Sequence, residues 1–379
     1  MKIVIAGDFC PHNRVERLIN DKKYSDIVSE EVREIFINSD ISIVNLECPV
    51  IDGNYPTIDK VGPSIKASNN SFGFLKHLGV NTVTLSNNHI MDYGAKGLES
   101  TIKGCIDNSI SYVGVGESFL KAREPLYIKL KNKTITILNI SENEFSTTHS
   151  NKPGANPLDL VNNYYDIIEA KKNSDYLILI YHGGHEGYKY PSPRMKKTFR
   201  YFIDLGVDLV VCHHSHCYSG YEEYNSKHIY YGLGNFIFDW PKVYNESWNY
   251  GYFLEVDTDV GKIDIHPYIQ GDKDVQLKLL NKDQHSNFLK ELKEINHIIL
   301  NDDLLSTKFS ELVKLRERSY LSLLQPYPGH LISGAYRRGI LPNIVSENQL
   351  LKHLNISRCE AHLDLYIASI KKNILKDQL

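Results

Sequence analysis

Three histidines crowd the end of one apolar segment of this chain. His213, His214 and His216 follow the run VDLVV, whose continuous apolar character predicts a buried strand. In proteins that alternate strands and helices, the ends of strands are where side chains converge on a metal or a substrate. Because neutral imidazole is a common metal ligand, the cluster predicts a metal site.

Four other predicted strands also end in a possible ligand. They carry Asp8 in AGDF, Glu47 in VNLE, Asn88 and His89 in LSNNHIMDYG, and His182 in IYHGGHEGY. Carboxylate and amide oxygens combined with imidazoles suit Mn, Fe or Zn better than Ca or Mg. These donors are too many for one tetrahedral ion, whereas two divalent metal ions bridged by a carboxylate would use them all.

Each of these residues has a simpler explanation when it is taken alone. Asp8 could cap a helix or form a turn, Asn88 with His89 could build a turn, and His182 could satisfy a backbone carbonyl. The same coincidence at five strand ends favours one shared site over five separate explanations.

The elements that must position these side chains alternate between strands and helices. Apolar runs predict buried strands at 2–8, 41–47, 81–87, 175–184 and 207–214, and amphipathic segments predict helices at 15–36 and 95–109. This order indicates an α/β fold with a largely parallel sheet covered on both faces. Hairpin-like stretches at 126–141 and 250–268 predict antiparallel strands, added to that sheet or forming a second sheet.

The composition changes near residues 275–282. From about Asp283 the sequence has helical periodicity, interrupted by the Pro- and Gly-rich connection QPYPGHLISGAYRRGILPN. We therefore expect one domain over 1–278 and a helical C-terminal extension over 279–379, which serves packing or partner binding.

Composition excludes several classes of protein. The net charge of -3 over 379 residues argues against a nucleic-acid binder, which normally needs a basic face. No apolar stretch is long enough to span a membrane, and the N-terminus enters a strand at once, so we expect a cytoplasmic protein without a membrane span. The six cysteines form no CxxC pair and are expected to be reduced.

The order of the motifs resembles a known family. GDF, NLECPV, LSNNHIMDYG, YHGGHEGY and HHSHCYSGYEEYNSKHIYYGLGNFIFD follow one another as in the bacterial capsule-synthesis CapA family, also called PGA_cap for poly-gamma-glutamate capsule. The resemblance covers roughly residues 1–270, and NNHxxDYG with GLGNFIFD is its most specific part. It implies a calcineurin-like metallophosphoesterase fold, an α+β sandwich of four layers in which two mixed sheets lie between helices.

The resemblance also implies a site with two metal ions and assigns a role to each ligand. Asp8 would hold one ion, Glu47 would bridge both, Asn88 and His182 would hold the second, and His214 and His216 would bind one ion each. His89 matches the histidine that faces the leaving group, and Asp92 would orient it. His213 and Cys10 are left as residues behind the ligands. Cys10 replaces a histidine of the phosphoesterases, and a buried small side chain is the favoured interpretation over a thiolate ligand.

Substrate contacts are expected at the lip of the site. The family's usual HWGxEY becomes HGGHEG here, so His185 and Glu186 are candidates, together with Asn235 in GLGNFIFD and Arg194 in PRMKKTFR. The alternative for PRMKKTFR is a solvated helix face. Tyr218, Tyr221 and Tyr224 could stack on a sugar or nucleotide, although tyrosines more often pack in the core and at its rim.

Taken together, these features predict a metal-dependent hydrolase. The expected chemistry is attack of metal-activated water on a phosphoester, with His89 as the general acid, in the biosynthesis of a capsule or other surface polymer. The substrate would be an anionic polymer precursor, a phosphorylated glycan or a phosphorylated small molecule. Two alternatives stay open: hydrolysis or transfer at a gamma-glutamyl amide, and a non-catalytic component that binds a polymer, a capsule-synthesis partner or a second copy through the C-terminal helices.

Overall fold

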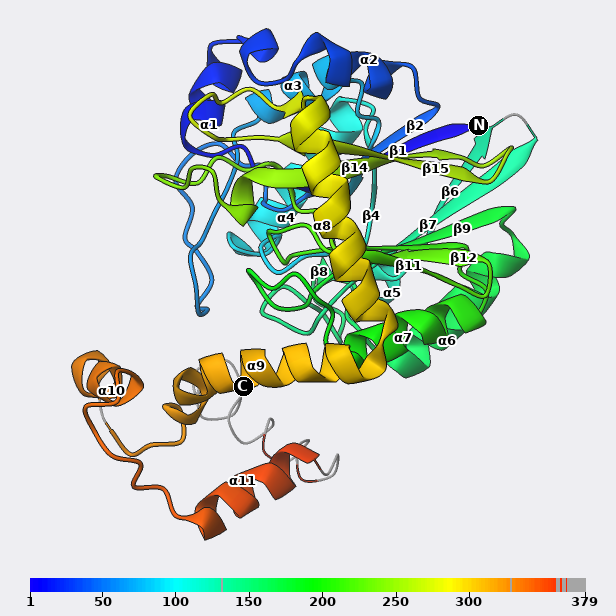
Figure 1. Ribbon diagram of the computed structural model, residues 1–379. Helices are drawn as coiled ribbons and strands as arrows, with labels where there is room; N and C mark the ends of the chain where they lie inside the picture. Colours follow the sequence, from blue (N-terminus) through cyan, green and yellow to red (C-terminus); the bar gives the residue numbers. More distant parts are fainter. Residues whose placement is uncertain (131, 328, 359–361, 363–365, 367–379) are drawn as a thin grey trace. The chain divides into compact units, whose positions relative to one another are not determined.

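The computed structural model shows two β-sheets stacked between helices (Figure 1). It describes all residues except 131, 328, 359–361, 363–365 and 367–379. The description below follows the sheets, the helices that cover them and the C-terminal part in turn.

The first sheet has eight strands and carries the N-terminus. Seven strands run in the order β16-β15-β14-β1-β2-β3-β4, and β13 pairs with β1. The strands β1 to β4 and β13 are parallel, whereas β14, β15 and β16 are antiparallel. The bounds are β1 (Lys2–Phe9), β2 (Ile41–Leu46), β3 (Thr82–Thr84), β4 (Ser111–Val113), β13 (Asn235–Ile237), β14 (Tyr250–Asp257), β15 (Lys262–Ile269) and β16 (Lys278–Leu279).

The second sheet has six strands in the order β11-β12-β10-β9-β7-β6. Its four inner strands are parallel, and the edge strands β6 and β11 are antiparallel. The bounds are β6 (Leu126–Leu130), β7 (Lys133–Ser141), β9 (Tyr176–His182), β10 (Leu209–His213), β11 (Tyr221–Tyr224) and β12 (Lys227–Tyr230), and a separate two-stranded ladder joins β5 (Val115–Gly116) to β8 (Gly154–Ala155). Both expected hairpins form, as β6–β7 and β14–β15, and the first belongs to this second sheet.

Helices cover the outer face of each sheet, as Figure 1 shows. The first sheet is flanked by α1 (Asn13–Asn20), α2 (Glu30–Ile37), α3 (Asn70–Leu78) and α4 (Gly94–Asp107), and the second by α6 (Leu160–Lys172) and α7 (Pro193–Asp204). Short helical turns lie at η1 (Tyr24–Asp26), α5 (Phe119–Ala122) and η2 (Ser247–Asn249). The prediction of a sandwich of two mixed sheets between helices is therefore confirmed. The single helix expected over 15–36 is wrong in detail, because Lys22 adopts a φ of 58° and separates α1 from α2.

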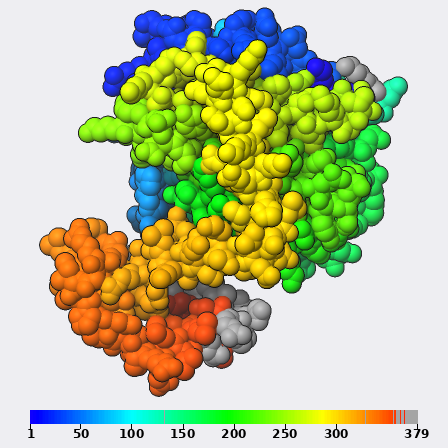
Figure 2. Space-filling view, viewed as in Figure 1, coloured from blue at the N-terminus to red at the C-terminus, as the bar shows by residue number. Residues whose placement is uncertain are grey.

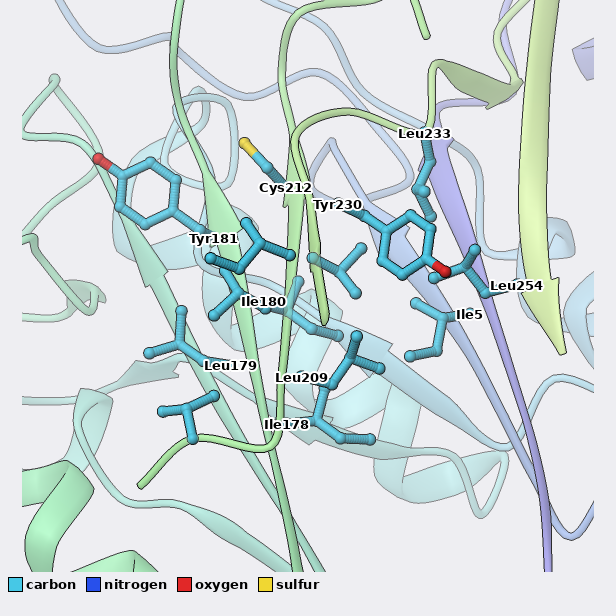
Figure 3. Packing of buried hydrophobic residues seen from close by; sticks show 14 of the residues in the cluster. Ile5, Ile178, Leu179, Ile180, Tyr181, Leu209, Cys212, Tyr230, Leu233 and Leu254 are labelled. Atoms are coloured by element: carbon cyan, nitrogen blue, oxygen red, sulfur yellow. The ribbon is translucent and has the colours of Figure 1, made fainter. Parts of the chain in front are cut away.

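The first sheet lies between two hydrophobic cores, and its side chains point alternately into one and the other. Ile3 and Ile5 of β1 point into the core between the two sheets, whereas Val4 and Ala6 join the core beneath the helices. In β9, Leu177 to Ile180 are all buried, as expected for a parallel strand that is covered on both faces. Figure 3 shows Ile5 of the first sheet facing Ile178 and Leu209 of the second.

The compact first unit extends further than the sequence suggests. The chain divides into a unit over Met1–Ser306 and a second unit over Thr307–Leu379, so the boundary falls later than the expected residue 278. The reason is α8 (Lys282–Leu300), which begins the expected extension but buries Phe288, Leu292, Ile295 and Ile299 against the first unit. Figure 2 shows this helix, in yellow, along the surface of the first unit.

Two polar contacts fix α8 in addition to its apolar face. Lys189 ion-pairs with Glu291 at 2.5 Å, and the backbone N–H of Tyr221 donates to Asn296 at 2.7 Å. The helix thereby connects β14, through Tyr252, with β11.

The second unit is helical in its described part. It contains most of α9 (Asp302–Leu321), α10 (His330–Arg337) and α11 (Glu347–Arg358). Gln325 donates to Asn343 at 2.7 Å, and Arg318 lies over the ring of the buried Tyr336. The helical character expected for this part of the chain is confirmed.

Candidate metal centre

Parallel strands from both sheets bring the predicted ligands to one edge. Asp8 lies near the end of β1, and Glu47 directly follows β2. In the other sheet His182 ends β9 and is in register with His213, which ends β10. Because parallel strands share their carboxyl-terminal edge, residues that are far apart in sequence meet there.

Two groups of buried side chains at this edge could each hold a metal ion. One group is Glu47, His182 and His214, the other is Asp8, Glu47 and His216, and within each group the ligand atoms lie within 4.8 Å of one another. Glu47 Oε1 is 3.4 Å from His182 Nε2 and 3.7 Å from His216 Nε2. Glu47 belongs to both groups, so its carboxylate lies within reach of an ion held by either one.

Asn88 lies beside the first of these groups. Its Oδ1 is 3.0 Å from His182 Nε2, the nitrogen that also faces Glu47. The structure thus gathers all six predicted ligands, Asp8, Glu47, Asn88, His182, His214 and His216, at one place.

The donor atoms at this place lack the partners that buried polar atoms normally have. Both carboxylate oxygens of Glu47 and Nδ1 of His214 are buried without a hydrogen-bond partner among the described residues. Such an orphaned group costs about 1–3 kcal/mol, and more when it is charged. An ion between the carboxylates and imidazoles would remove that cost, so the donor set fits a metal centre.

The pKa values of Asp8 and Glu47 also fit a site for a cation. Burial and the charge of Glu47 raise the pKa of Asp8 to about 8, and burial likewise raises the pKa of Glu47. Two buried carboxylates repel each other unless a cation lies between them. Burial lowers the pKa of His182 and of His214, which leaves both imidazoles neutral and able to act as ligands.

His214 and His216 also hold an unfavourable backbone conformation. Their φ angles are 93° and 54°, in the region that non-glycine residues rarely adopt. Conformations of this kind cost about 1–3 kcal/mol each and cluster at functional sites. The backbone N–H of His214 donates to Asp8 Oδ2 at 3.3 Å, which helps to hold the strained turn against the first sheet.

Two asparagines orient the ligands from behind. Asn45 donates to Asp8 Oδ1 at 2.8 Å and lies 3.2 Å from His182 Nδ1. His216 Nδ1 donates to Asn235 Oδ1 at 2.9 Å. This hydrogen bond orients the ring so that Nε2 faces Glu47.

The position of Asn235 corrects its expected role as a substrate contact. Its side chain is fully buried, its Oδ1 faces His216, and its Nδ2 donates to the carbonyl oxygens of His216 and Trp248. The side chain is therefore engaged within the protein and acts on the ligand His216.

A histidine–carboxylate pair stands next to the ligands. His89 Nδ1 is 2.7 Å from Asp92 Oδ2, and since a carboxylate oxygen only accepts, Nδ1 donates and Nε2 remains for the site. Asp92 is fully buried and accepts a second bond, at 2.8 Å, from the backbone N–H of Ile65. This is the arrangement predicted for His89 and Asp92.

Lys60 completes this pair and was missed from the sequence. Its side chain is 4% exposed, it ion-pairs with Asp92, and its Nζ lies 3.1 Å from His89 Nδ1. Lysine is almost never buried without a partner. Nothing in the polar segment NYPTIDKVGPS distinguishes this lysine from a solvated one, so the signal is visible only in the fold.

His213 lies near Asp8, and Cys10 lies in the core under the helices. His213 Nδ1 is 3.9 Å from Asp8 Oδ1, and burial lowers its pKa to about 3, so the ring is neutral. Cys10 is fully buried in the core under the helices, where burial and the thiol of Cys48 raise its pKa. Burial in this core favours the interpretation of Cys10 as a packing residue over a thiolate ligand.

The lip of the site is acidic. The guanidinium of Arg194 forms an ion pair with Glu142 at 2.6 Å, so its charge is balanced within the protein. Glu142 also accepts a hydrogen bond from the backbone N–H of Gly184. His185 is half-buried and Glu186 is exposed on the following turn. Burial is the main cause of the raised pKa of Glu47, and the charge of Glu186 adds a smaller contribution in the same direction.

Two other cations of PRMKKTFR and one of the proposed tyrosines make their contacts within the protein. Lys196 is buried and donates to the carbonyl of Ile299, and Arg200 pairs with the buried Glu222. Tyr218 is 4% exposed and packs on Phe288 at 4.4 Å between ring centroids. These contacts favour the structural interpretation of PRMKKTFR and of Tyr218.

Comparison with known proteins matches the motifs that build this centre. The family described as "Bacterial capsule synthesis protein PGA_cap" matches residues 2–240, which include every proposed ligand. The chain belongs to the PGA_cap family.

Curated relatives of this PGA_cap protein extend the match. It is 30% identical over 248 residues to "Capsule biosynthesis protein CapA" of Bacillus anthracis, covering 63% of this chain and 60% of the relative. It is 31% identical over 270 residues to "PGA biosynthesis protein CapA" of Bacillus subtilis, covering 69% and 70%. A "Probable polyglutamine synthesis accessory protein" of Mycobacterium tuberculosis is 26% identical over 219 residues, covering 54% and 57%.

The described helices of this PGA_cap chain are too short or too polar for a membrane span. Among the residues that the structure describes, none of the helices is both long enough and apolar enough to cross a membrane.

Proposed function

We propose that this chain is a metal-dependent hydrolase that cleaves a phosphoester in the assembly of a capsule or another surface polymer. The single observation that carries the proposal is Glu47, a buried carboxylate shared by two groups of metal-ligand residues and without a hydrogen-bond donor in the described part of the chain. The role in polymer assembly rests on the names of the two Bacillus relatives.

Six side chains would hold two divalent ions, of Mn, Fe or Zn. Asp8 and His216 would bind one ion, Asn88, His182 and His214 the other, and Glu47 both. Bound there, the ions would supply a Lewis acid for phosphoryl oxygens and make water nucleophilic near neutral pH.

The protein's own contribution is to the leaving group. His89 directs Nε2 away from Asp92 and would donate a proton from it to the departing oxygen. Asp92 fixes the tautomer and the orientation of the ring. Lys60 balances the buried charge of Asp92, and the backbone N–H of Ile65 donates to the same carboxylate.

The experiment is an activity screen of the purified full-length protein with Mn²⁺ present. Phosphomonoesters, phosphodiesters and gamma-glutamyl amides are compared for the wild type and for Asp8→Asn and His214→Gln. We expect hydrolysis of one ester class and a loss of at least about 100-fold in each variant, because metal-activated water provides most of the acceleration. His285→Gln, a half-buried histidine near the start of α8, serves as the matched control with unchanged activity.

Two outcomes would reject the proposal in different ways. If the protein cleaved only the gamma-glutamyl amides, water would attack a carbonyl carbon and not a phosphorus atom, and the protein would be an amide hydrolase. A folded Asp8→Asn protein that binds no metal but still supports polymer production in cells would identify a non-catalytic assembly component.

A further inference from the structure

A continuous aromatic surface leads away from the metal centre. The ring of Trp248 lies 4.6 Å from that of His216, Trp240 lies 5.9 Å from Trp248, and His12 stacks on Trp240 at 5.4 Å. Phe238 packs beneath both indoles, at 5.0 and 5.8 Å. We call His12, Trp240 and Trp248 the aromatic ledge. Its two tryptophans are the only ones in the sequence.

The ledge stands at the same edge of the sheet as the ligands. Trp240 and Trp248 follow β13, and His12 follows β1, and these two strands are parallel and pair at Asp8 and Asn235. All three side chains of the ledge are partly exposed, whereas Phe238 is 3% exposed. The surface that they offer therefore begins at a proposed ligand, His216, and continues toward solvent.

Hydrogen bonds hold the ledge in place. Trp248 donates through its indole N–H to the carbonyl of Phe238 at 2.8 Å, and its own carbonyl accepts from Asn235 and Gln270. Asp239, directly before Trp240, is fully buried and is paired with Arg14. A ledge that is ordered before binding loses little conformational entropy on binding.

The same segment has a backbone that is costly to build. Lys242 and Asn245, between the two tryptophans, have φ angles of 62° and 55°. Left-handed conformations at non-glycine residues persist where surrounding contacts impose them, and they cluster at ligand-binding segments. Because its indole N–H is already engaged, Trp248 would meet a ligand through the exposed part of its ring and not through a hydrogen-bond donor.

We propose that the aromatic ledge is a binding subsite for a sugar ring of the substrate. The proposal deepens the proposed function, since the sugar would be the part of a phosphorylated glycan next to the phosphoester. A saturated ring presents apolar C–H groups, which match the negative faces of the indoles.

The same reasoning disfavours a gamma-glutamyl chain on the ledge. Its free carboxylates would meet the negative faces of the aromatic rings and gain no attraction from them. We therefore expect the ledge to bind the sugar of a phosphorylated glycan in preference to a gamma-glutamyl chain.

Intrinsic fluorescence measures binding at the ledge directly, because both tryptophans lie in it. The full-length protein is titrated with a panel of hexose and N-acetylhexosamine 1-phosphates, with Zn²⁺ present, and inorganic phosphate, a gamma-glutamyl oligomer and uridine monophosphate are titrated in parallel. We expect a saturable change in emission with at least one sugar phosphate, and weaker or no change with the other three probes.

Variants assign the change to the ledge. Trp240→Leu should weaken binding of the sugar phosphate about tenfold, the order expected for removal of one stacking ring. Trp240→Phe, which keeps a ring, should restore most of the affinity and guards against a folding defect, which thermal unfolding also checks. Tyr165→Ala, an exposed aromatic on α6, is the matched control with unchanged affinity.

The outcomes separate this inference from the proposed function. Phosphoester hydrolysis without any response to the sugar phosphates, or a response that Trp240→Leu leaves intact, overturns the subsite and leaves the hydrolase. A stronger response to the gamma-glutamyl oligomer or to uridine monophosphate overturns it as well. Binding at the ledge without hydrolysis supports the subsite and rejects the hydrolase.

Discussion

At the scale of single residues, Glu47 shows how a proposed function opposes stability. Its carboxylate is fully buried, and burial raises its pKa above the ordinary value near 4.5. A carboxyl group whose folded-state pKa is raised destabilises the fold at every pH where it is ionised in the unfolded chain. At neutral pH the metal-free protein therefore bears this cost, and bound ions would remove it.

Substitution of Glu47 separates the two effects. We expect Glu47→Gln to raise the stability of the metal-free protein by about 1–3 kcal/mol, because an uncharged amide replaces a buried charge. The same variant should lose metal. Thermal unfolding in EDTA, together with metal analysis of the purified protein, checks both. A variant that is less stable in EDTA and still retains the full metal content would contradict this account of Glu47.

Lys60 allows a second test at this scale. Lys60→Met leaves Asp92 as an unbalanced buried charge and should disturb the orientation of His89. The turnover of esters with poor leaving groups should fall about 100-fold, whereas activated aryl esters, which need no proton from His89, should be much less affected. Steady-state kinetics with a leaving-group series measures the split.

Lys66→Met is the matched control for Lys60. Lys66 lies on the same segment but donates to the carbonyl of Gly53 near the surface. Equal losses for all leaving groups in Lys60→Met, with the protein folded, would mean that Lys60 only stabilises the segment and does not position His89.

At the scale of elements, the strand ends could be predicted from the sequence and their neighbours could not. Asp8, Glu47 and His182 stand out because an apolar run directly precedes each of them. Asn45 orients two ligands but lies inside the run ISIVNLE, where an asparagine carries no local signal. Asn235 was singled out as a substrate contact, but its hydrogen bond with His216 was not foreseen, because periodicity does not show how the loop after β10 folds back toward β13.

The boundary of the first unit depended on the same kind of long-range contact. The periodicity of α8 predicts a helix but not the surface on which it packs. Phe288 lies in that interface, 4.4 Å from Tyr218 and 6.0 Å from Tyr252 between ring centroids.

A substitution in α8 tests its place in the first unit. Phe288→Ala should lower the free energy of unfolding by about 3–5 kcal/mol, because it leaves a cavity against the core. Leu289→Ala, one residue away and 41% exposed, should change it by less than about 1 kcal/mol. Urea unfolding followed by circular dichroism measures both, and equal small effects would show α8 to be independent of the first unit.

Asp208 connects three elements and gives a pH-dependent prediction. Burial acts against its charged form, but Lys171 and Lys227 outweigh it and lower its pKa. The carboxylate also accepts from the backbone N–H of Leu177 at 2.8 Å. Since the folded-state pKa is depressed, this stabilisation is present above the ordinary value near 3.8 and is lost as the pH falls through the folded-state value.

Asp208→Asn should therefore cost about 2 kcal/mol at neutral pH and progressively less below about pH 4. Thermal unfolding of both proteins between pH 7 and pH 3 gives the difference. The control is Asp264→Asn, whose carboxylate pairs with Lys262 at the surface, and it should be near neutral throughout. A cost at Asp208 that stays constant down to pH 3 would exclude the ionic origin.

At the scale of the whole molecule, the alternation of strands and helices followed from periodicity, and the set of candidate ligands followed from the strand ends and the motif order. The arrangement of two sheets did not follow from periodicity, because an apolar run does not reveal which sheet it joins. Periodicity could not predict the burial of Lys60 or the aromatic ledge for a similar reason. Both are formed by loops that meet only after β1, β2 and β13 have paired.

The measurement that tests the central claim most directly is anomalous diffraction from crystals of the full-length protein grown with Mn²⁺. We predict two peaks in each chain, both within ligand distance of Glu47, one also next to Asp8 and His216 and the other next to His182 and His214. Asp8→Asn should remove the first peak and His214→Gln the second. A protein that binds no ion at this edge, or a single ion that Glu47 does not contact, would contradict the account.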